Sequence, residues 1–160
     1  MNKCLAPFIA SALILSAIPA IAKTEATLQV ARPGFEGFDR HHIALTDKMS
    51  DGRDVLLLMS CKLNDPTNYG AVIDFGVGSI WDIEGEAVTI ETDSHKVELP
   101  MNSDGEFLVM GGVPAVKAFL PLLAARKASF TANGVVATFD LTAVHNHISR
   151  FKALCHPNAE

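Results

Sequence analysis

Two cysteines far apart in the chain are the feature that most constrains how this sequence can fold. The chain has 160 residues and 3 cysteines: Cys4 lies near the amino terminus, while Cys61 and Cys155 lie near the middle and the end. A disulfide between the last two would tie the end of the chain to its middle. Whether such a bond forms depends on the compartment in which the protein folds.

The amino-terminal segment predicts that this compartment is oxidising. Lys3 supplies a positive charge, residues 5–18 are almost entirely apolar, and an Ala-Ile-Ala tripeptide ends the segment at residue 22. This is the layout of a cleavable secretory signal, so we expect cleavage after Ala22 and a location in the periplasm or outside the cell. A disulfide between the two remaining cysteines is then the simplest expectation. The alternative is a pair of thiols acting as nucleophile or ligands, which their wide separation and the lack of a Cys-x-x-Cys motif disfavour.

Charge and hydropathy limit the partners. The formal net charge is −5 and there is no basic tract, which disfavours nucleic acid and anionic lipid as partners. Beyond the signal, the best apolar run, residues 113–125, is too short to cross a bilayer and contains Lys117 and Pro121. We therefore expect no membrane span after signal removal. The sequence divides into a signal peptide (1–22), a lead-in (23–40) and one domain (41–157).

The domain has the pattern of a mostly antiparallel α+β fold with about six to eight strands and two helices. The apolar run 55–61 is too short for a helix and indicates a buried central strand. Asn133-Gly134 is the strongest hairpin signal. The segments with strand character are 43–46, 55–61, 71–75, 87–92, 96–99, 106–110, 127–131 and 135–139.

Two segments have helical spacing. Pro114 suits the first turn of a helix, and Pro121 should shorten or kink that helix. Asp140 is expected to cap a final helix whose apolar positions share one face up to Leu154. Because Cys155 follows on that helix, the predicted disulfide would attach it to the central strand.

The histidines and acids give weak signals for chemistry. Neighbouring histidines on a strand (His41, His42), or two apart on a helix (His145, His147), point away from each other, so a shared metal ion is disfavoured. An acidic row at 82, 84 and 86 could serve glycoside hydrolysis, but a solvated edge is the more ordinary explanation. No nucleophile elbow or complete dinucleotide loop is present. We therefore expect no catalytic residue, metal or other cofactor.

Tyr69 and Trp81 are the only tyrosine and tryptophan, and both are predicted beside loops. Exposed aromatic side chains often anchor partner proteins, so these two are the candidate partner contacts. The alternative is packing over the rim of the sheet.

Several stretches of the back half resemble small periplasmic proteins associated with type VI secretion systems. The stretches are LVM at 108–110, FLPLL at 119–123, ASFT at 128–131, ATFDL at 137–141 and FKALC at 151–155. In that family a hydrophobic helix leads into a hairpin, a T-F-D-L run follows, and a last helix ends in cysteine. The chain departs from the family in lacking its R-x-T-P-Y stretch and the tryptophan after the last cysteine. The resemblance implies a non-catalytic accessory protein of the cell envelope.

The leading hypothesis is thus a non-catalytic periplasmic or secreted protein that contacts another envelope or secreted protein. A narrower version is an inhibitor of a secreted hydrolase such as lysozyme, because the acidic charge would steer the protein toward a basic enzyme. The hypotheses from other classes are a small envelope hydrolase using the acids near Trp81 and one of the histidines, and a metal-binding module using His41, His42, His145 and His147.

Overall fold

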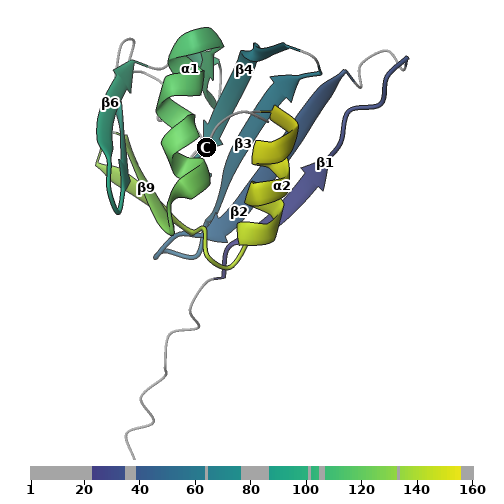
Figure 1. The fold of residues 1–160 in the computed structure, drawn as a ribbon. Helices are drawn as coiled ribbons and strands as arrows, with labels where there is room; N and C mark the ends of the chain where they lie inside the picture. The colour runs from purple at the N-terminus through teal and green to yellow at the C-terminus, as the bar shows by residue number, and fades with distance from the viewer. Residues whose placement is uncertain are drawn as a thin grey trace, which may run out of the picture.

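The structure, a computed structural model, describes residues 23–34, 39–63, 65–76, 87–100, 102–104, 107–132 and 134–155. These residues form two antiparallel sheets, two α-helices and a short 3-10 helix (Figure 1). In chain order the elements are β1 (Glu25–Gln29), β2 (Arg40–Lys48), β3 (Asp54–Lys62), β4 (Asp65–Asp74), β5 (Ala87–Thr92), β6 (Lys96–Pro100), β7 (Asn102–Asp104), β8 (Phe107–Gly111), α1 (Gly112–Phe119), η1 (Leu120–Ala124), β9 (Lys127–Ala132), β10 (Val135–Asp140) and α2 (His145–Cys155).

The strands divide between two sheets. Sheet A has six strands in the order β1-β2-β3-β4-β8-β7, and sheet B has four in the order β10-β9-β5-β6. The chain leaves sheet A after β4, returns to it with β7 and β8, and completes sheet B with β9 and β10. The prediction of an antiparallel α+β domain is confirmed, with its strands shared between two sheets.

Alternation along the central strands of sheet A decides which face is buried. In β2, in β3 and in β4 from Tyr69 onward, the odd-numbered side chains are buried, and the even-numbered ones are partly or fully exposed. In an antiparallel sheet this period of two places one set of side chains on each face. Helix α1 packs on β4 and β8, and α2 packs on β2 and β1, so both helices cover the buried face. In Figure 1 both helices lie in front of sheet A.

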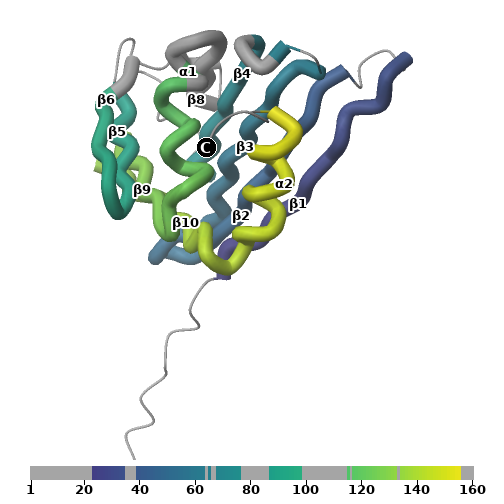
Figure 2. The backbone as a smooth tube through the Cα atoms, in the orientation of Figure 1, coloured from purple at the N-terminus to yellow at the C-terminus, as the bar shows by residue number. Residues whose placement is uncertain are grey.

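Sheet B closes the core from the side of α1. Phe119 at the end of α1 stacks on Phe130 of β9, with ring centroids 6.3 Å apart, and Phe130 meets Phe139 of β10 edge-on at 5.7 Å. All three rings are fully buried. Figure 2 shows β5, β6 and β9 gathered on one side of α1 and β3 and β4 on the other. Helix α1 therefore lies between the two sheets and supplies apolar surface to both.

A threonine hydroxyl joins the two sheets at the amino-terminal end of β1. The Thr24 hydroxyl donates to the Asp47 carboxylate on β2 and accepts from the Asp140 backbone N–H on β10 at 2.7 Å. Thr24 is 1% exposed and Asp47 is 9% exposed. Both polar groups are thus satisfied inside the fold, as buried polar groups must be.

The first helix ends as the sequence predicts, while the last helix begins later than predicted. Helix α1 stops at Phe119 and a 3-10 turn containing Pro121 follows, which confirms the expected effect of this proline. The last helix begins at His145, later than predicted, because Asp140 ends β10 and its carboxylate accepts from the Thr142 N–H at 3.0 Å in the connecting turn. The expected N-cap is thus a turn residue.

Two short strands were not predicted. The segment 23–40 contains β1, which pairs with β2 over its whole length, so part of the expected lead-in belongs to sheet A. The expected turn at 102–105 contains β7, a three-residue strand paired with β8. Both lie at edges of sheet A, where short strands leave little periodicity to detect.

The disulfide is present as predicted. The sulfur atoms of Cys61 and Cys155 are 1.97 Å apart and the Cα atoms 5.8 Å apart, within the range that a disulfide requires. The bond attaches the last residue of α2 to β3 in the middle of sheet A. Among the described residues, no helix has the length and apolarity needed to cross a bilayer.

Candidate functional site

The face of sheet A that no described helix covers carries a row of aliphatic side chains. We call this the outer face; its apolar row is Ala44, Leu58 and Val72, which pair across β2, β3 and β4. Leu56 lies beside the row, two residues from Leu58 on the same strand. All four are partly exposed, and none of them packs against the hydrophobic core. An apolar row on a solvent-facing sheet marks a candidate interaction surface.

This row corrects the prediction for the run 55–61. The sequence run was expected to be a buried central strand, and β3 is indeed central in sheet A. Only its odd-numbered side chains, such as Leu57 and Met59, are buried; Leu56 and Leu58 face outward. The apolar run could have revealed this surface only together with the packing of the helices on one side of the sheet.

Polar residues border the row at the end where β2 begins and β3 ends. The Arg40 guanidinium reaches over β3, where Nε donates to the Ser60 hydroxyl at 3.2 Å, to β4, where Nη1 donates to the Asn68 side-chain oxygen at 2.8 Å. Nη2 donates to the Asn68 backbone carbonyl at 2.9 Å. Three neutral acceptors on two strands thus fix the position of a partly buried cation.

His42 lies in the same row as Ser60, directly across from it in the ladder. Burial lowers the pKa of the His42 imidazole below its usual 6.5, the positive charge of Arg40 and the neighbouring His41 lower it further, and Asp39 raises it. At neutral pH the imidazole is therefore uncharged. Lys62 lies at the same end of the strands, and its Nζ is 3.6 Å from the Asp39 carboxylate.

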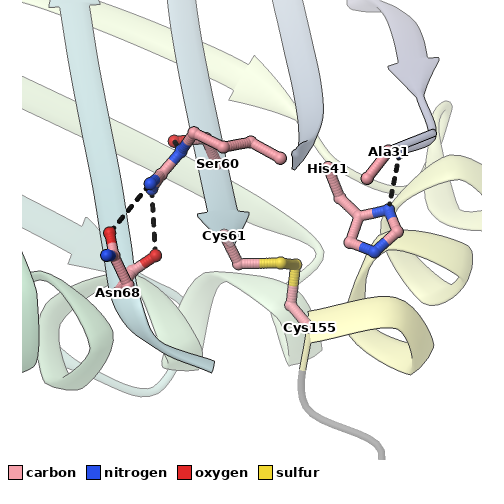
Figure 3. The surroundings of a disulfide bond; sticks show 7 residues. Ala31, His41, Ser60, Cys61, Asn68 and Cys155 are labelled. Atoms are coloured by element: carbon pink, nitrogen blue, oxygen red, sulfur yellow. Dashed lines mark hydrogen bonds between the residues drawn. A yellow bond between two sulfur atoms is a disulfide. The ribbon is translucent and has the colours of Figure 1, made fainter. Parts of the chain in front are cut away.

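The opposite face of the same strands holds the disulfide (Figure 3). Cys61 on β3 pairs with His41 on β2. The His41 Nδ1 accepts from the Ala31 backbone N–H at 3.1 Å. This acceptor role requires Nδ1 to be unprotonated, and burial lowers the pKa of His41 below 6.5. Ser60 and Cys61 are consecutive residues of β3, so their side chains lie on opposite faces of the sheet. The covalent bond therefore fixes the strand that positions Ser60.

The predicted aromatic contacts have different outcomes. Tyr69 is 2% exposed and meets Phe151 of α2 edge-on at 6.2 Å, so its placement in the core excludes the expected surface contact. Tyr69, Ala71 and Ile73 occupy alternate positions of β4, and this alternation in the sequence could have shown that Tyr69 is buried. Burial also raises the pKa of the Tyr69 hydroxyl. Trp81 lies outside the described residues.

The other predicted groups do not come together within the described part of the chain. His41 and His42 face opposite sides of sheet A, as expected. His145 and His147 are exposed on α2, where His145 Nε2 lies 3.2 Å from the Ser149 hydroxyl. Within the described residues, no three His, Cys, Asp or Glu side chains are grouped to hold a metal ion. The acidic row at 82, 84 and 86 and the expected cleavage point lie outside these residues.

A polar hollow of about 580 Å³ lies at one end of sheet B. Two of its charged side chains interact with each other: the Asp93 carboxylate accepts from the Arg126 backbone N–H at 3.1 Å and from Arg126 Nε at 3.3 Å, which lowers the pKa of Asp93. The Arg126 carbonyl accepts from the N–H of Leu141 at 2.9 Å and of Thr142 at 3.2 Å. These contacts hold the turn before α2, so we assign the hollow a structural role.

No protein-family model, curated protein or solved structure matches this chain. The outer face of sheet A, with its apolar row and the Arg40 cluster, is therefore identified from geometry alone. Sequence analysis missed this cluster because Ser60 and Asn68 are 20 and 28 residues from Arg40 in the chain and meet it only through strand pairing.

Proposed function

We propose that this protein is a non-catalytic exported binding module that contacts another envelope or secreted protein through the outer face of sheet A. The observation that carries the proposal is the row of Ala44, Leu58 and Val72, which faces away from the core on a sheet whose helices all lie on its other side within the described residues. Apolar surface of this kind is stabilised when a partner covers it.

Two further observations support the proposal. The Cys61–Cys155 disulfide is typical of proteins that fold in the periplasm or outside the cell, which agrees with the secretory pattern of residues 1–22. An arginine bordered by partly exposed aliphatic side chains is the composition that protein interfaces favour. The resemblance of the back half to periplasmic proteins associated with type VI secretion points to the same class.

Site-specific crosslinking in the native host tests this proposal. A photoreactive benzoylphenylalanine replaces Leu58 on the outer face of sheet A or, as the matched control, Thr131 on sheet B. We expect position 58 to give a discrete adduct with one envelope or secreted protein and position 131 to give none. Equal adducts at both positions, or none at position 58 in correctly folded protein, would contradict the proposal.

Intact-mass analysis of the purified native protein, without reductant, tests the export part. We expect a chain that begins at Lys23 and lacks two hydrogens because of the disulfide. A full-length chain with two alkylatable thiols at Cys61 and Cys155 would contradict export.

A further inference from the structure

We infer that the partner segment presents an aspartate or glutamate carboxylate to Arg40, two residues from an aliphatic side chain that covers Leu58. This inference rests on the proposed function and adds the chemistry of the occupant. It follows from how Arg40 is held, from which charges around it are already neutralised, and from the spacing of Arg40 and the apolar row.

The Arg40 guanidinium is preorganised but not saturated. Of its five N–H donors, three are used: Nε by the Ser60 hydroxyl, Nη1 by the Asn68 side-chain oxygen and Nη2 by the Asn68 carbonyl. One N–H group therefore remains on each of Nη1 and Nη2. The neutral acceptors fix the orientation of the group, so little side-chain entropy is lost when an anion binds.

Arg40 keeps its positive charge uncompensated within the described residues. The ion pairs there are Lys48–Asp54, Arg53–Asp51, Lys62–Asp39, Lys96–Glu91 and Arg126–Asp93, and none includes Arg40. The arginine is nonetheless partly buried on the sheet. A partly desolvated cation attracts an anion more strongly than an exposed one does, and a carboxylate fits the planar N–H groups of arginine.

The apolar row fixes what accompanies the carboxylate. Ser60, which anchors Arg40, and Leu58 lie two residues apart on β3 and face the same side. Two residues along a strand span about 7 Å, and alternate side chains of an extended segment share one side at the same spacing. An extended partner segment aligned with β3 therefore places an acidic side chain on Arg40 when an aliphatic side chain two positions away lies on Leu58.

Peptide binding followed by NMR tests this inference. The probes are the acetylated, amidated peptide Thr-Leu-Thr-Glu-Thr and its analogue with Gln in place of Glu, added to the ¹⁵N-labelled mature protein. We expect the Glu peptide to shift the amide signals of Leu58 and Ser60 and the Nε–H signal of Arg40. We expect it to bind about tenfold more tightly than the Gln peptide, the ratio that one charge-assisted hydrogen bond supplies.

Three variants distinguish the specific contribution of Arg40 to peptide binding from that of positive charge in general. Arg40→Gln removes the cation and should abolish the preference for the Glu peptide, while Lys62→Gln removes a neighbouring cation that is already paired and should retain it. An unchanged amide spectrum elsewhere verifies that each variant is folded. Arg40→Lys keeps the charge but loses the bonds to Ser60 and Asn68, and should retain only part of the preference.

The outcomes distinguish this inference from the proposed function. If both peptides shift the outer-face signals equally, the carboxylate preference is wrong while the docking surface stands. If the signals that move belong to sheet B, or if no signal moves at millimolar peptide, the inference is overturned. The crosslinking experiment at Leu58 then decides the proposed function independently, because it uses the native partner and not a peptide.

Discussion

The outer faces of the two sheets differ in chemistry although both sheets are antiparallel and both cover the same core. Across sheet B, one row reads Thr138, Ser129, Glu91 and Lys96. Its polar groups satisfy one another: the Ser129 and Thr138 hydroxyls lie 3.0 Å apart, and Lys96 Nζ lies 3.2 Å from the Glu91 carboxylate. In contrast, the central row of sheet A reads Ala44, Leu58 and Val72.

This difference separates a solvated face on sheet B from the proposed contact face on sheet A. Threonine, serine and a paired Glu–Lys are what a strand presents to water, and they leave no unmatched charge for a partner. Sheet A instead presents aliphatic side chains next to an arginine held by Ser60 and Asn68. The exception on sheet B is Val136, which is 53% exposed on the edge strand β10. A single exposed valine does not form a patch.

The largest expected effect comes from removing the disulfide, which belongs to sheet A alone. The double variant Cys61→Ala, Cys155→Ala should lose about 2–5 kcal/mol of unfolding free energy, because the bond closes a long loop. Hydrogen exchange should lose protection first in α2 and β3, while β5 and β9 of sheet B keep theirs. Treatment of the parent protein with reductant is the control and should give the same pattern. Uniform loss across both sheets would remove the distinction between them.

A pair of glycine substitutions gives the next largest effect. Gly76, after β4, has φ +63°, and a Cβ there would lie 2.3 Å from the Asp54 carbonyl oxygen; Gly134, in the sheet B hairpin, has φ +73° and open space. Gly76→Ala should therefore cost about 2–4 kcal/mol from backbone strain and overpacking together, and Gly134→Ala about 1 kcal/mol from strain alone. Chemical denaturation measures both. Equal costs would show that the close approach at Gly76 relaxes freely.

Acid should weaken the sheet A side through His41. Its pKa is below 6.5 in the folded protein, so the unfolded chain binds a proton more readily and the free energy of unfolding falls as the pH drops below 6.5. Above that pH the contribution is fully present. Loss of the bond from the Ala31 N–H should cost about 1 kcal/mol.

The variant His41→Asn keeps an acceptor oxygen that does not titrate, so its stability should vary less between pH 7 and pH 5. His95→Asn, in the exposed turn of sheet B, is the control and should leave the pH dependence of the parent unchanged. Thermal unfolding across this pH range measures both variants. If His41→Asn retains the full pH dependence, another group is responsible, and His42, whose pKa is also lowered, is the next to replace.

The smallest effect on stability is expected at the outer face of sheet A. Leu58→Thr should cost at most about 1 kcal/mol, because the side chain is partly exposed and does not pack on the core. The same change should shorten retention on a hydrophobic-interaction column, while Thr131→Ser on sheet B should leave retention unchanged. A large loss of stability for Leu58→Thr would mean that this face is structural.

The sequence predicts the buried half of this fold better than the exposed half. Alternation and the Asn133-Gly134 signal locate the β9–β10 hairpin, and the two cysteines place α2 on sheet A. The run 55–61 predicts the central strand but not its exposed face, because a run of apolar residues does not say whether both faces of a strand are covered. That depends on where α1 and α2 pack, which is a property of the whole chain.

The candidate site was out of reach for a related reason. Arg40, Ser60 and Asn68 belong to three strands, and their contact depends on the register of β2 on β3 and on the irregularity in β3–β4 pairing after Cys61. No local pattern encodes such a register. Tyr69 was predicted at the surface, but in its case the sequence holds the answer. Its spacing of two and four residues from Ala71 and Ile73 indicates that all three side chains face the core.

The hydroxyl of Thr24 makes the position of the proposed signal cleavage matter for the contact between the two sheets. That oxygen links Asp47 of one sheet to the Asp140 backbone of the other, one residue after the expected start of the processed chain. A leader peptidase that cut two residues further along would release a molecule whose two halves share no such link. The proposed cleavage after Ala22 would therefore preserve this link between the two sheets.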